Sequence, residues 1–240
     1  MAEQTGRARV VPPDLSETGG LKDGAPQRSD RRLYMQLLCF AGCADASSVA
    51  HTLSGLPIET VIYEELNDPT GVGILALSED PNAFLDTLAP ALRAVTSGFS
   101  PKPELSMFGR TYSLGYEPDL QDTLTGRPRR TVLNPDWRWA IWYPLRRSGS
   151  FAQLPADQQR TILAEHGTIG MAFGAGDLAH DIRLACHGLD RADNDFVIGL
   201  IGKDLFPLSA VVQSMRKTQQ TSLYLDRLGP FFVGRTLLPR

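Results

Sequence analysis

The chain from residue 32 onward runs twice through the same order of predicted elements, β-α-β-β-α-β. This duplication limits the possible folds more than any single motif does. In the first half, alternating and three-to-four spacings of apolar residues predict the elements. The predicted strands are residues 33–40, 59–66, 72–77 and 105–114, and the predicted helices are residues 45–53 and 81–94. Asp45 and Pro81 are residue types that begin helices, which supports both helix assignments.

The second half repeats this order with little residue identity, so the repeat is one of elements and not of sequence. Its predicted strands are residues 138–145, 182–188, 196–202 and 230–238, and its predicted helices are residues 154–173 and 206–226. Each half has the ferredoxin-like order. Two such sheets can join edge to edge, which protects their edges. We therefore predict an α+β fold, a duplicated ferredoxin-like unit that forms an antiparallel β-barrel with outer helices.

The pattern divides the chain into four segments. Residues 1–31 have no periodic apolar pattern and are expected to form a mobile tail. Residues 32–116 form the first ferredoxin-like half, and residues 117–137 are expected to be an ordered, basic loop that links the halves. Residues 138–240 form the second half, which holds three of the four histidines and all three tryptophans. We expect the functional site in this second half.

Composition excludes several classes of function. A formal net charge of -3 provides no basic surface, so nucleic acid is not an expected partner. No apolar run reaches the length of a membrane span. The first residues lack an apolar signal segment, so we expect a cytoplasmic protein. Three cysteines are too few for a disulfide framework, and we expect buried, reduced thiols.

His166 is the first candidate for a functional residue. Ile162, His166, Ile169 and Phe173 recur at helical spacing, so the imidazole should share the buried face of its helix. A buried imidazole needs a partner for at least one ring nitrogen. That partner is either a backbone carbonyl, as for an ordinary core histidine, or a metal such as haem iron.

Six short motifs follow one another at characteristic spacings in the second half. They are Trp142-Tyr143-Pro144-Leu145, Ala164-Glu165-His166-Gly167-Thr168-Ile169-Gly170, Gly188-Leu189-Asp190, Asp195-Phe196-Val197, Ser214-Met215-Arg216-Lys217-Thr218 and Gly229-Pro230-Phe231-Phe232-Val233-Gly234. This series resembles the chlorite dismutase-like family of haem proteins, which includes chlorite dismutases and coproheme decarboxylases. The resemblance covers residues 138–238. It implies the duplicated ferredoxin-like barrel, a bound haem b or iron coproporphyrin III, and a homo-oligomer, commonly a pentamer.

The resemblance also implies roles for individual residues. His166 matches the axial ligand of the haem iron. The family often anchors that histidine with a carboxylate, and here Gln219 or Gln220 stands in its place. An amide would give the imidazole less anionic character and push less electron density to iron.

On the opposite side of the porphyrin, Arg183 matches the position where chlorite dismutases carry arginine, with a register uncertain by a residue or two. Asp181, Arg183 and Ala185 share one face of their strand. A guanidinium there would bind an anion over iron, or else form a salt bridge to Asp181, Asp177 or a neighbouring chain.

Tyr143 matches the tyrosine that supplies a radical in coproheme decarboxylases, or else it is a structural tyrosine. Arg146 and Arg147 are candidate clamps for propionates, with a solvated surface position as the alternative for at least one of them. Trp142 is either a haem contact or, by default, a core residue. His187 and His180 are expected to be structural and exposed, respectively.

We favour a small-molecule enzyme similar to coproheme decarboxylases, which use peroxide to convert iron coproporphyrin to haem b. The Tyr-Pro pair and the His-Gly motif support this interpretation. A chlorite dismutase, favoured by Arg183, or a divergent haem peroxidase is the alternative. An alternative outside the enzymes is a haem-binding protein without catalytic activity. A structural barrel without a cofactor is a further alternative, but it would leave the ordered motifs unexplained.

Overall fold

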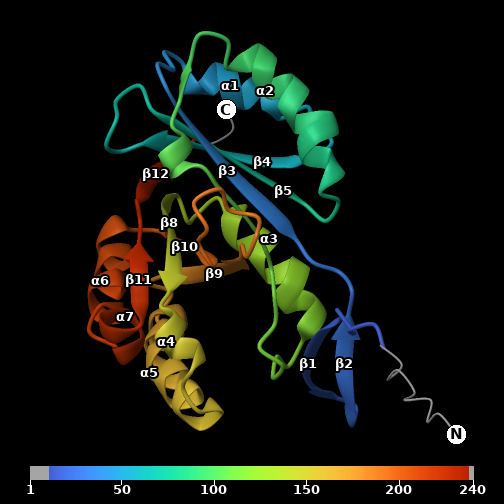
Figure 1. Cartoon of the computed structure of the whole chain (residues 1–240). Helices are drawn as coiled ribbons and strands as arrows, with labels where there is room; N and C mark the ends of the chain where they lie inside the picture. Colours follow the sequence, from blue (N-terminus) through green and yellow to red (C-terminus); the bar gives the residue numbers. More distant parts are fainter. Residues whose placement is uncertain (1–10, 238–240) are drawn as a thin grey trace, which may run out of the picture.

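The computed structural model describes residues 11–237, which form one ten-stranded antiparallel sheet, outer helices and a separate two-stranded hairpin (Figure 1). The hairpin strands are β1 (Glu17–Lys22) and β2 (Ala25–Ser29). The strands of the large sheet are β3 (Tyr34–Ala41), β4 (Glu59–Glu65), β5 (Val72–Ser78), β6 (Ser100–Pro101), β7 (Met107–Arg110), β8 (Trp139–Arg147), β9 (His180–Ala185), β10 (Phe196–Gly202), β11 (Leu225–Leu228) and β12 (Phe232–Thr236).

Helices connect most of these strands. In the first half they are α1 (Ala46–Leu53), η1 (Phe84–Leu88), α2 (Ala89–Val95) and η2 (Pro103–Leu105). The later ones are η3 (Asp122–Gly126), α3 (Arg127–Val132), α4 (Gly149–Ala152), α5 (Ala156–Ala175), α6 (Leu205–Met215) and α7 (Gln219–Leu223). The predicted N-cap of the first helix is confirmed, because the Asp45 side chain accepts a hydrogen bond from the Ser47 backbone N–H at 2.9 Å. None of the helices in residues 11–237 is long and apolar enough to cross a membrane.

The strand order is β10-β9-β7-β3-β5-β4-β12-β8-β11, with β6 beside β3, and β8 also pairs with β10. The strand pairings that start at β10 therefore lead around the sheet and back to β10. The two halves meet through β4 with β12 and through one pair of residues, Arg110 with Ala185, between β7 and β9. The predicted α+β fold with two ferredoxin-like units is confirmed, since the two sheets join edge to edge in this way.

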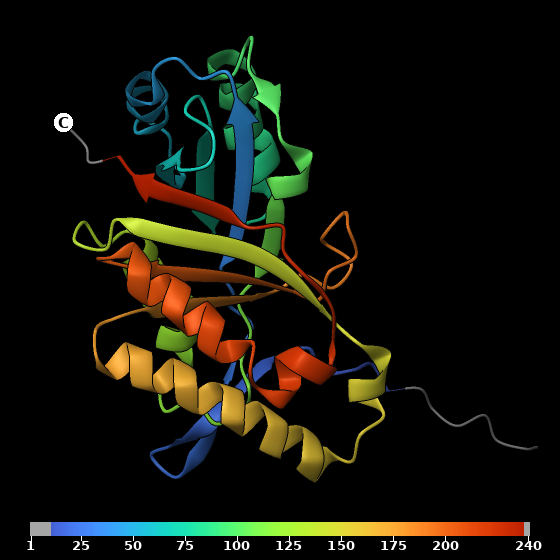
Figure 2. The ribbon, with the colours of Figure 1, turned by 90° about the vertical axis from the view of Figure 1, so that its left-hand side faces the viewer.

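The two faces of the sheet bury different clusters. The inner face holds a core that includes Met35, Tyr63, Trp142, Leu184 and Phe232. Gly199 leaves room for the Trp142 ring, since a Cβ at this position would lie 2.5 Å from it. On the outer face, α1 and α2 cover the first half, and α5 and α6 cover the second (Figure 2). The second outer cluster contains Tyr143.

The prediction of a mobile tail over residues 1–31 is wrong for residues 17–29, which form the hairpin. Gly20 N–H donates to the Glu117 carbonyl at 2.9 Å, and the Gln27 side-chain amide donates to the same carbonyl at 3.0 Å. Glu17 accepts hydrogen bonds from Arg110 and Ser113. These contacts join residues far apart in sequence, so local composition did not indicate them. Residues 1–10 lie outside the described part of the chain.

Two other element predictions need correction. The prediction of a loop over residues 117–137 is wrong for residues 122–132, which are helical in η3 and α3. The helix predicted over residues 206–226 ends at Met215, and α7 and β11 follow it. β11 pairs with β8, so strand pairing replaces the last turns of the predicted helix.

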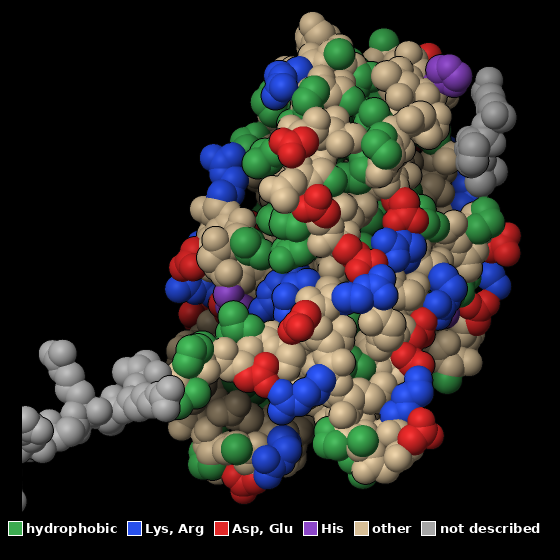
Figure 3. Space-filling view, turned by 90° about the vertical axis from the view of Figure 1, so that its right-hand side faces the viewer, with side chains coloured by type: hydrophobic (Ala, Val, Ile, Leu, Met, Phe, Trp, Pro, Cys, Tyr) green, Lys and Arg blue, Asp and Glu red, His purple; other side chains and the backbone are tan. Residues whose placement is uncertain are grey.

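Charged side chains of both signs are interspersed over the face shown in Figure 3. This mixture agrees with the small formal net charge of -3. Alternation of signs keeps such a surface solvated without one strong field.

Candidate functional site

Three strands of the second half carry one row of side chains across the outer face of the sheet. Tyr143 on β8 pairs with Ile198 on β10, and Ile198 pairs with Arg183 on β9. Directly paired residues of an antiparallel sheet point to the same side. Helices α5 and α6 pack on this side, so the row faces the helix that carries His166.

His166 is half-buried on α5, as are Ile169 and Phe173, so the helix face predicted to be buried is only partly covered. Its Nδ1 lies 3.3 Å from the hydroxyl oxygen of Thr218. Burial lowers the pKa of the imidazole, and the positive charges of Arg147 and Arg183 lower it further. The ring is therefore neutral at physiological pH, the form that binds a metal.

Neither glutamine predicted to anchor His166 bonds to the ring in the described residues. Gln219 is exposed, and its backbone N–H donates to the Glu165 carboxylate at 3.0 Å. Gln220 is buried, and its backbone carbonyl accepts from Tyr224 N–H. Thr218 takes the predicted place of the glutamines, because the turn that ends α6 brings its hydroxyl to the imidazole.

Arg183 shares a face of its strand with Asp181, as the alternation predicted, and that face is the outer side of the sheet and not the inside of the barrel. Its Nε is 3.1 Å from Oδ2 of Asp181, and the two side chains keep 40% and 42% of their surface exposed. One of the alternatives raised for this arginine, a salt bridge to Asp181, is therefore present. The pair leaves the other guanidinium nitrogens without a carboxylate partner among the described residues.

Tyr143 is 7% exposed, and its ring stacks on Phe231 with 4.6 Å between centroids. Burial raises the pKa of its phenol, the negative charge of Asp181 raises it further, and Arg216 opposes this rise. The hydroxyl is a protonated phenol at neutral pH. Oxidation of such a group must remove a proton together with the electron.

Arg147, and not Arg146, shares the side of β8 that carries Tyr143, because side chains alternate along a strand. Its guanidinium lies over two rings, 4.9 Å from the centroid of Phe151 and 4.7 Å from that of Phe196. Burial lowers its pKa, and its Nε is buried without a partner in residues 11–237. Arg146 instead forms an ion pair with Asp193 at 2.5 Å.

Trp142 lies in the core of the inner face and is fully buried there against Tyr63 and Phe232. It is therefore on the opposite side of the sheet from Tyr143. This placement supports the default interpretation of Trp142 as a core residue and gives no porphyrin contact. The other two histidines of the second half have structural partners: His187 Nδ1 lies 3.3 Å from Asp195, and His180, which was predicted to be exposed, is half-buried and stacks on Trp137.

The comparisons with known proteins decide the family. The family model described as chlorite dismutase matches residues 72–237, which is more than half of the chain.

The chain belongs to the chlorite dismutase family.

Solved structures agree with this assignment at the level of the fold. A haem-binding protein from Thermus thermophilus superposes with a TM-score of 0.69 at 19% identity, over 96% of each chain. A putative chlorite dismutase superposes with a TM-score of 0.67 at 18% identity, over 87% of this chain and 96% of its own. The chlorite dismutase from Candidatus Nitrospira defluvii, in complex with imidazole, gives 0.65 at 15% identity, over 88% and 93%. Among curated protein sequences, none matches this chain.

In this member of the chlorite dismutase family, the first half also contributes to the site. Tyr112 follows β7, and its ring centroid lies 5.6 Å from that of Phe196. Burial raises the pKa of Tyr112, while the charges of Arg183 and Arg147 lower it. The sequence pattern did not point to this residue, because the motifs placed the site in the second half alone. No local sequence signal marks Tyr112, because it reaches Phe196 through the pairing of Arg110 on β7 with Ala185 on β9.

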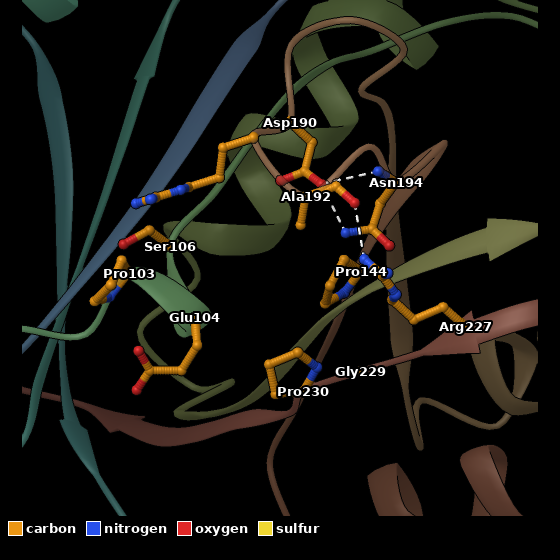
Figure 4. A pocket seen from close by; sticks show the side chains of 11 residues that line it. Pro103, Glu104, Ser106, Pro144, Asp190, Ala192, Asn194, Arg227, Gly229 and Pro230 are labelled. Atoms are coloured by element: carbon orange, nitrogen blue, oxygen red, sulfur yellow. Dashed lines mark hydrogen bonds between the residues drawn. The ribbon is translucent and has the colours of Figure 1, made fainter.

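A cavity of about 260 Å³ opens where the first half meets the β9–β10 loop (Figure 4). Asp190 accepts hydrogen bonds from Asn194 in its wall, and Arg227 donates to the Ala192 carbonyl at 2.8 Å. None of the site residues predicted from the sequence lines it. The cavity is therefore separate from the row that contains Tyr143 and Arg183.

Proposed function

We propose that this chain binds an iron porphyrin and acts as a coproheme decarboxylase, with peroxide as oxidant. One observation carries the proposal: Tyr143 and Arg147 lie on the side of β8 that faces α5, the helix of His166. This arrangement combines three groups: a phenol that can undergo one-electron oxidation, a guanidinium that can bind a carboxylate and an imidazole that can bind iron. Membership in the chlorite dismutase family supports the same substrate class.

The residues present fit an iron porphyrin. His166 contacts Thr218 through Nδ1, and its Nε2 has no hydrogen-bond partner within residues 11–237. Apolar side chains where α5 packs on the sheet are only half-buried, namely Ile169 and Phe173 on α5 and Phe196, Ile198 and Phe231 on the sheet side. A flat apolar ligand would cover these surfaces. Arg147 lacks a carboxylate partner in the described chain, and the carboxylates of the ligand supply one.

When bound, the iron porphyrin supplies the redox centre that takes oxidising equivalents from peroxide. His166 would hold the metal through Nε2, and Arg147 would orient a propionate by charge-assisted hydrogen bonds. Tyr143 would lose an electron and its phenolic proton, and the resulting radical would take a hydrogen atom from the propionate side chain. The side-chain radical would then lose one more electron, to the second oxidising equivalent of the same peroxide, and release carbon dioxide to leave the vinyl group. For each propionate, R–CH2CH2COO⁻, H2O2 and H⁺ give R–CH=CH2, CO2 and two H2O.

A second function, chlorite dismutation, is favoured by Arg183. This guanidinium stands in the same row as Tyr143, where it can meet a small anion bound opposite the imidazole. A third, haem binding without turnover, is favoured by the uncharged Thr218 anchor of His166, which gives iron less electron density than a carboxylate would.

The deciding experiment adds ferric coproheme and, separately, haem b to the purified apoprotein, titrates each with hydrogen peroxide and follows the porphyrin by mass spectrometry. We expect coproheme to lose two carboxyl groups in succession. Coproheme that binds but keeps all its carboxyl groups would overturn the decarboxylase proposal, and oxygen release from chlorite would then establish the second function. His166→Ala should lose the axial-ligand spectrum, while His180→Ala, which removes a histidine paired with Asp177, should keep it.

We also propose a homo-oligomer, in keeping with the family. Phe206 on α6 and Met171 on α5 are 80% and 69% exposed, and contact with another copy would cover such apolar side chains. Light scattering of the purified protein tests this proposal, and a monomeric mass would refute it.

A further inference from the structure

Two neighbouring residues of α5 contact two neighbouring residues at the start of α7. The Glu165 carboxylate accepts from the backbone N–H of Gln219 at 3.0 Å, and His166 Nδ1 lies 3.3 Å from Thr218 Oγ1. Thr218 is 1% exposed and precedes the first residue of α7. The double contact sets the rotation of α5 relative to α7, and so it sets which atom of the imidazole meets the hydroxyl.

The hydroxyl proton of Thr218 is already in use. Thr218 Oγ1 donates to the Met215 carbonyl at 2.8 Å, a stronger contact than the 3.4 Å to Thr221 Oγ1. A threonine hydroxyl has one proton and two lone pairs. Towards His166 it therefore acts as acceptor, and the imidazole must donate from Nδ1. A neutral imidazole that carries its proton on Nδ1 has a bare lone pair on Nε2.

We infer that Thr218 is the positioning residue of His166: its hydroxyl accepts from the imidazole, selects the Nδ1–H tautomer and turns bare Nε2 away from α7. The role toward iron rests on the proposed function, whereas the choice of tautomer does not. A hydroxyl acceptor carries no charge, so it draws the Nδ1 proton less strongly than a carboxylate does. The imidazole consequently gives less electron density to a bound metal.

Glu165 has a separate part in this arrangement. Its carboxylate satisfies one free N–H at the start of α7, a favourable place for negative charge. The bond holds the backbone on which Thr218 stands without touching the imidazole. Replacement of Glu165 should therefore loosen the position of Thr218 without removing the hydroxyl acceptor.

The first test uses apoprotein labelled with 15N-histidine and reads the tautomer of His166 from the nitrogen chemical shifts. We expect a protonated Nδ1 and a bare Nε2 in the unmodified protein and in Thr218→Ser, and loss of this preference in Thr218→Val. Thr168→Val is the matched control, since within residues 11–237 the Thr168 hydroxyl bonds only to the Ala164 carbonyl of the same helix. A protonated Nε2 in the unmodified protein would overturn the inference, as would an unchanged tautomer in Thr218→Val. If Thr218→Val does not fold, the nitrogen chemical shifts of the unmodified protein still test the tautomer that the inference requires.

The second test uses the ferrous haem b complex and measures the iron–histidine stretching frequency and the midpoint potential. Thr218→Val should lower the frequency, and Thr218→Glu should raise it and shift the potential to more negative values. Unchanged values in both variants would refute the role toward iron. Absence of an iron–histidine band in the unmodified complex would instead refute the proposed function. In that case the nitrogen shifts of the apoprotein still decide the tautomer.

Discussion

Tyr143 and Arg183 stand in one row of the sheet, separated only by Ile198 on the strand between them. Adjacent strands lie about 4.8 Å apart, so the two backbones are roughly 10 Å from each other. A single ligand the size of a porphyrin can therefore contact both side chains. The two enzymatic functions considered for this chain differ in which of the two residues does the chemistry.

Arg183→Ala should weaken fluoride or cyanide binding to the ferric complex by about ten- to a hundredfold, because a charge-assisted hydrogen bond worth about 1.5–3 kcal/mol is lost. Asp181→Asn should strengthen the same binding, because the arginine loses its carboxylate partner at 3.1 Å. Spectral titration of each variant measures both effects. Equal anion affinity in the unmodified protein and both variants would show that Arg183 does not contact an anion bound at the iron.

Tyr143→Phe should retain porphyrin binding and stop coproheme decarboxylation. The phenyl ring keeps the stack on Phe231, but it has no O–H from which a hydrogen atom can be lost. Mass spectrometry of the porphyrin after peroxide addition measures conversion. Tyr34→Phe, which changes a tyrosine stacked on Phe108 in the first half, is the control and should convert coproheme normally. Conversion by Tyr143→Phe at the normal rate would exclude the radical role.

Arg147→Ala should raise the Kd for coproheme by about tenfold or more, and it should affect a porphyrin without propionates much less. Arg146→Ala should change neither affinity, because that side chain pairs with Asp193 on the protein surface. Fluorescence quenching titrations give the Kd values. The opposite ranking of the two variants would restore Arg146 as the propionate ligand.

Gly199→Ala should destabilise the fold by about 1–3 kcal/mol, since its Cβ would overlap the Trp142 ring in a filled core. Gly55→Ala is the matched control, because a Cβ there meets nothing within 4 Å. Urea unfolding followed by tryptophan fluorescence measures both changes. A Gly199→Ala protein as stable as the control would mean that the ring can move aside.

The cysteines of the native protein should react slowly with thiol reagents at pH 8, and unfolding should increase the reaction rate. Burial raises the pKa of Cys186 to about 12, and Cys39 and Cys43 also have raised pKa values because of burial. Little thiolate is therefore present near neutral pH, and the thiolate is the reactive form. A chromogenic disulfide measures the rate with and without denaturant. Rapid reaction of the native chain would contradict the buried, reduced state of all three cysteines.

Local sequence patterns predicted helices and strands best where the stabilising contacts are between residues close together in sequence. Asp45 caps its helix as predicted, and the helix of His166 is found within two residues of its predicted start and end. The pattern failed after Met215, where one long helix was predicted and the chain instead forms the short helix α7 and then β11, whose pairing with β8 overrides helical propensity. It failed again at residues 17–29, whose hairpin depends on bonds to Glu117.

The sequence by itself determined the duplicated order of elements, the family and the helix on which His166 lies, because spacing and ordered motifs are properties of the linear chain. Only the tertiary structure decided which neighbours share a face. Alternation along β8 says that Trp142 and Tyr143 point apart, but strand pairing decides which side becomes the inner core. The partner of His166 was likewise decided by folding, since Thr218 is 52 residues away and reaches the imidazole only after α6 and α7 pack beside α5.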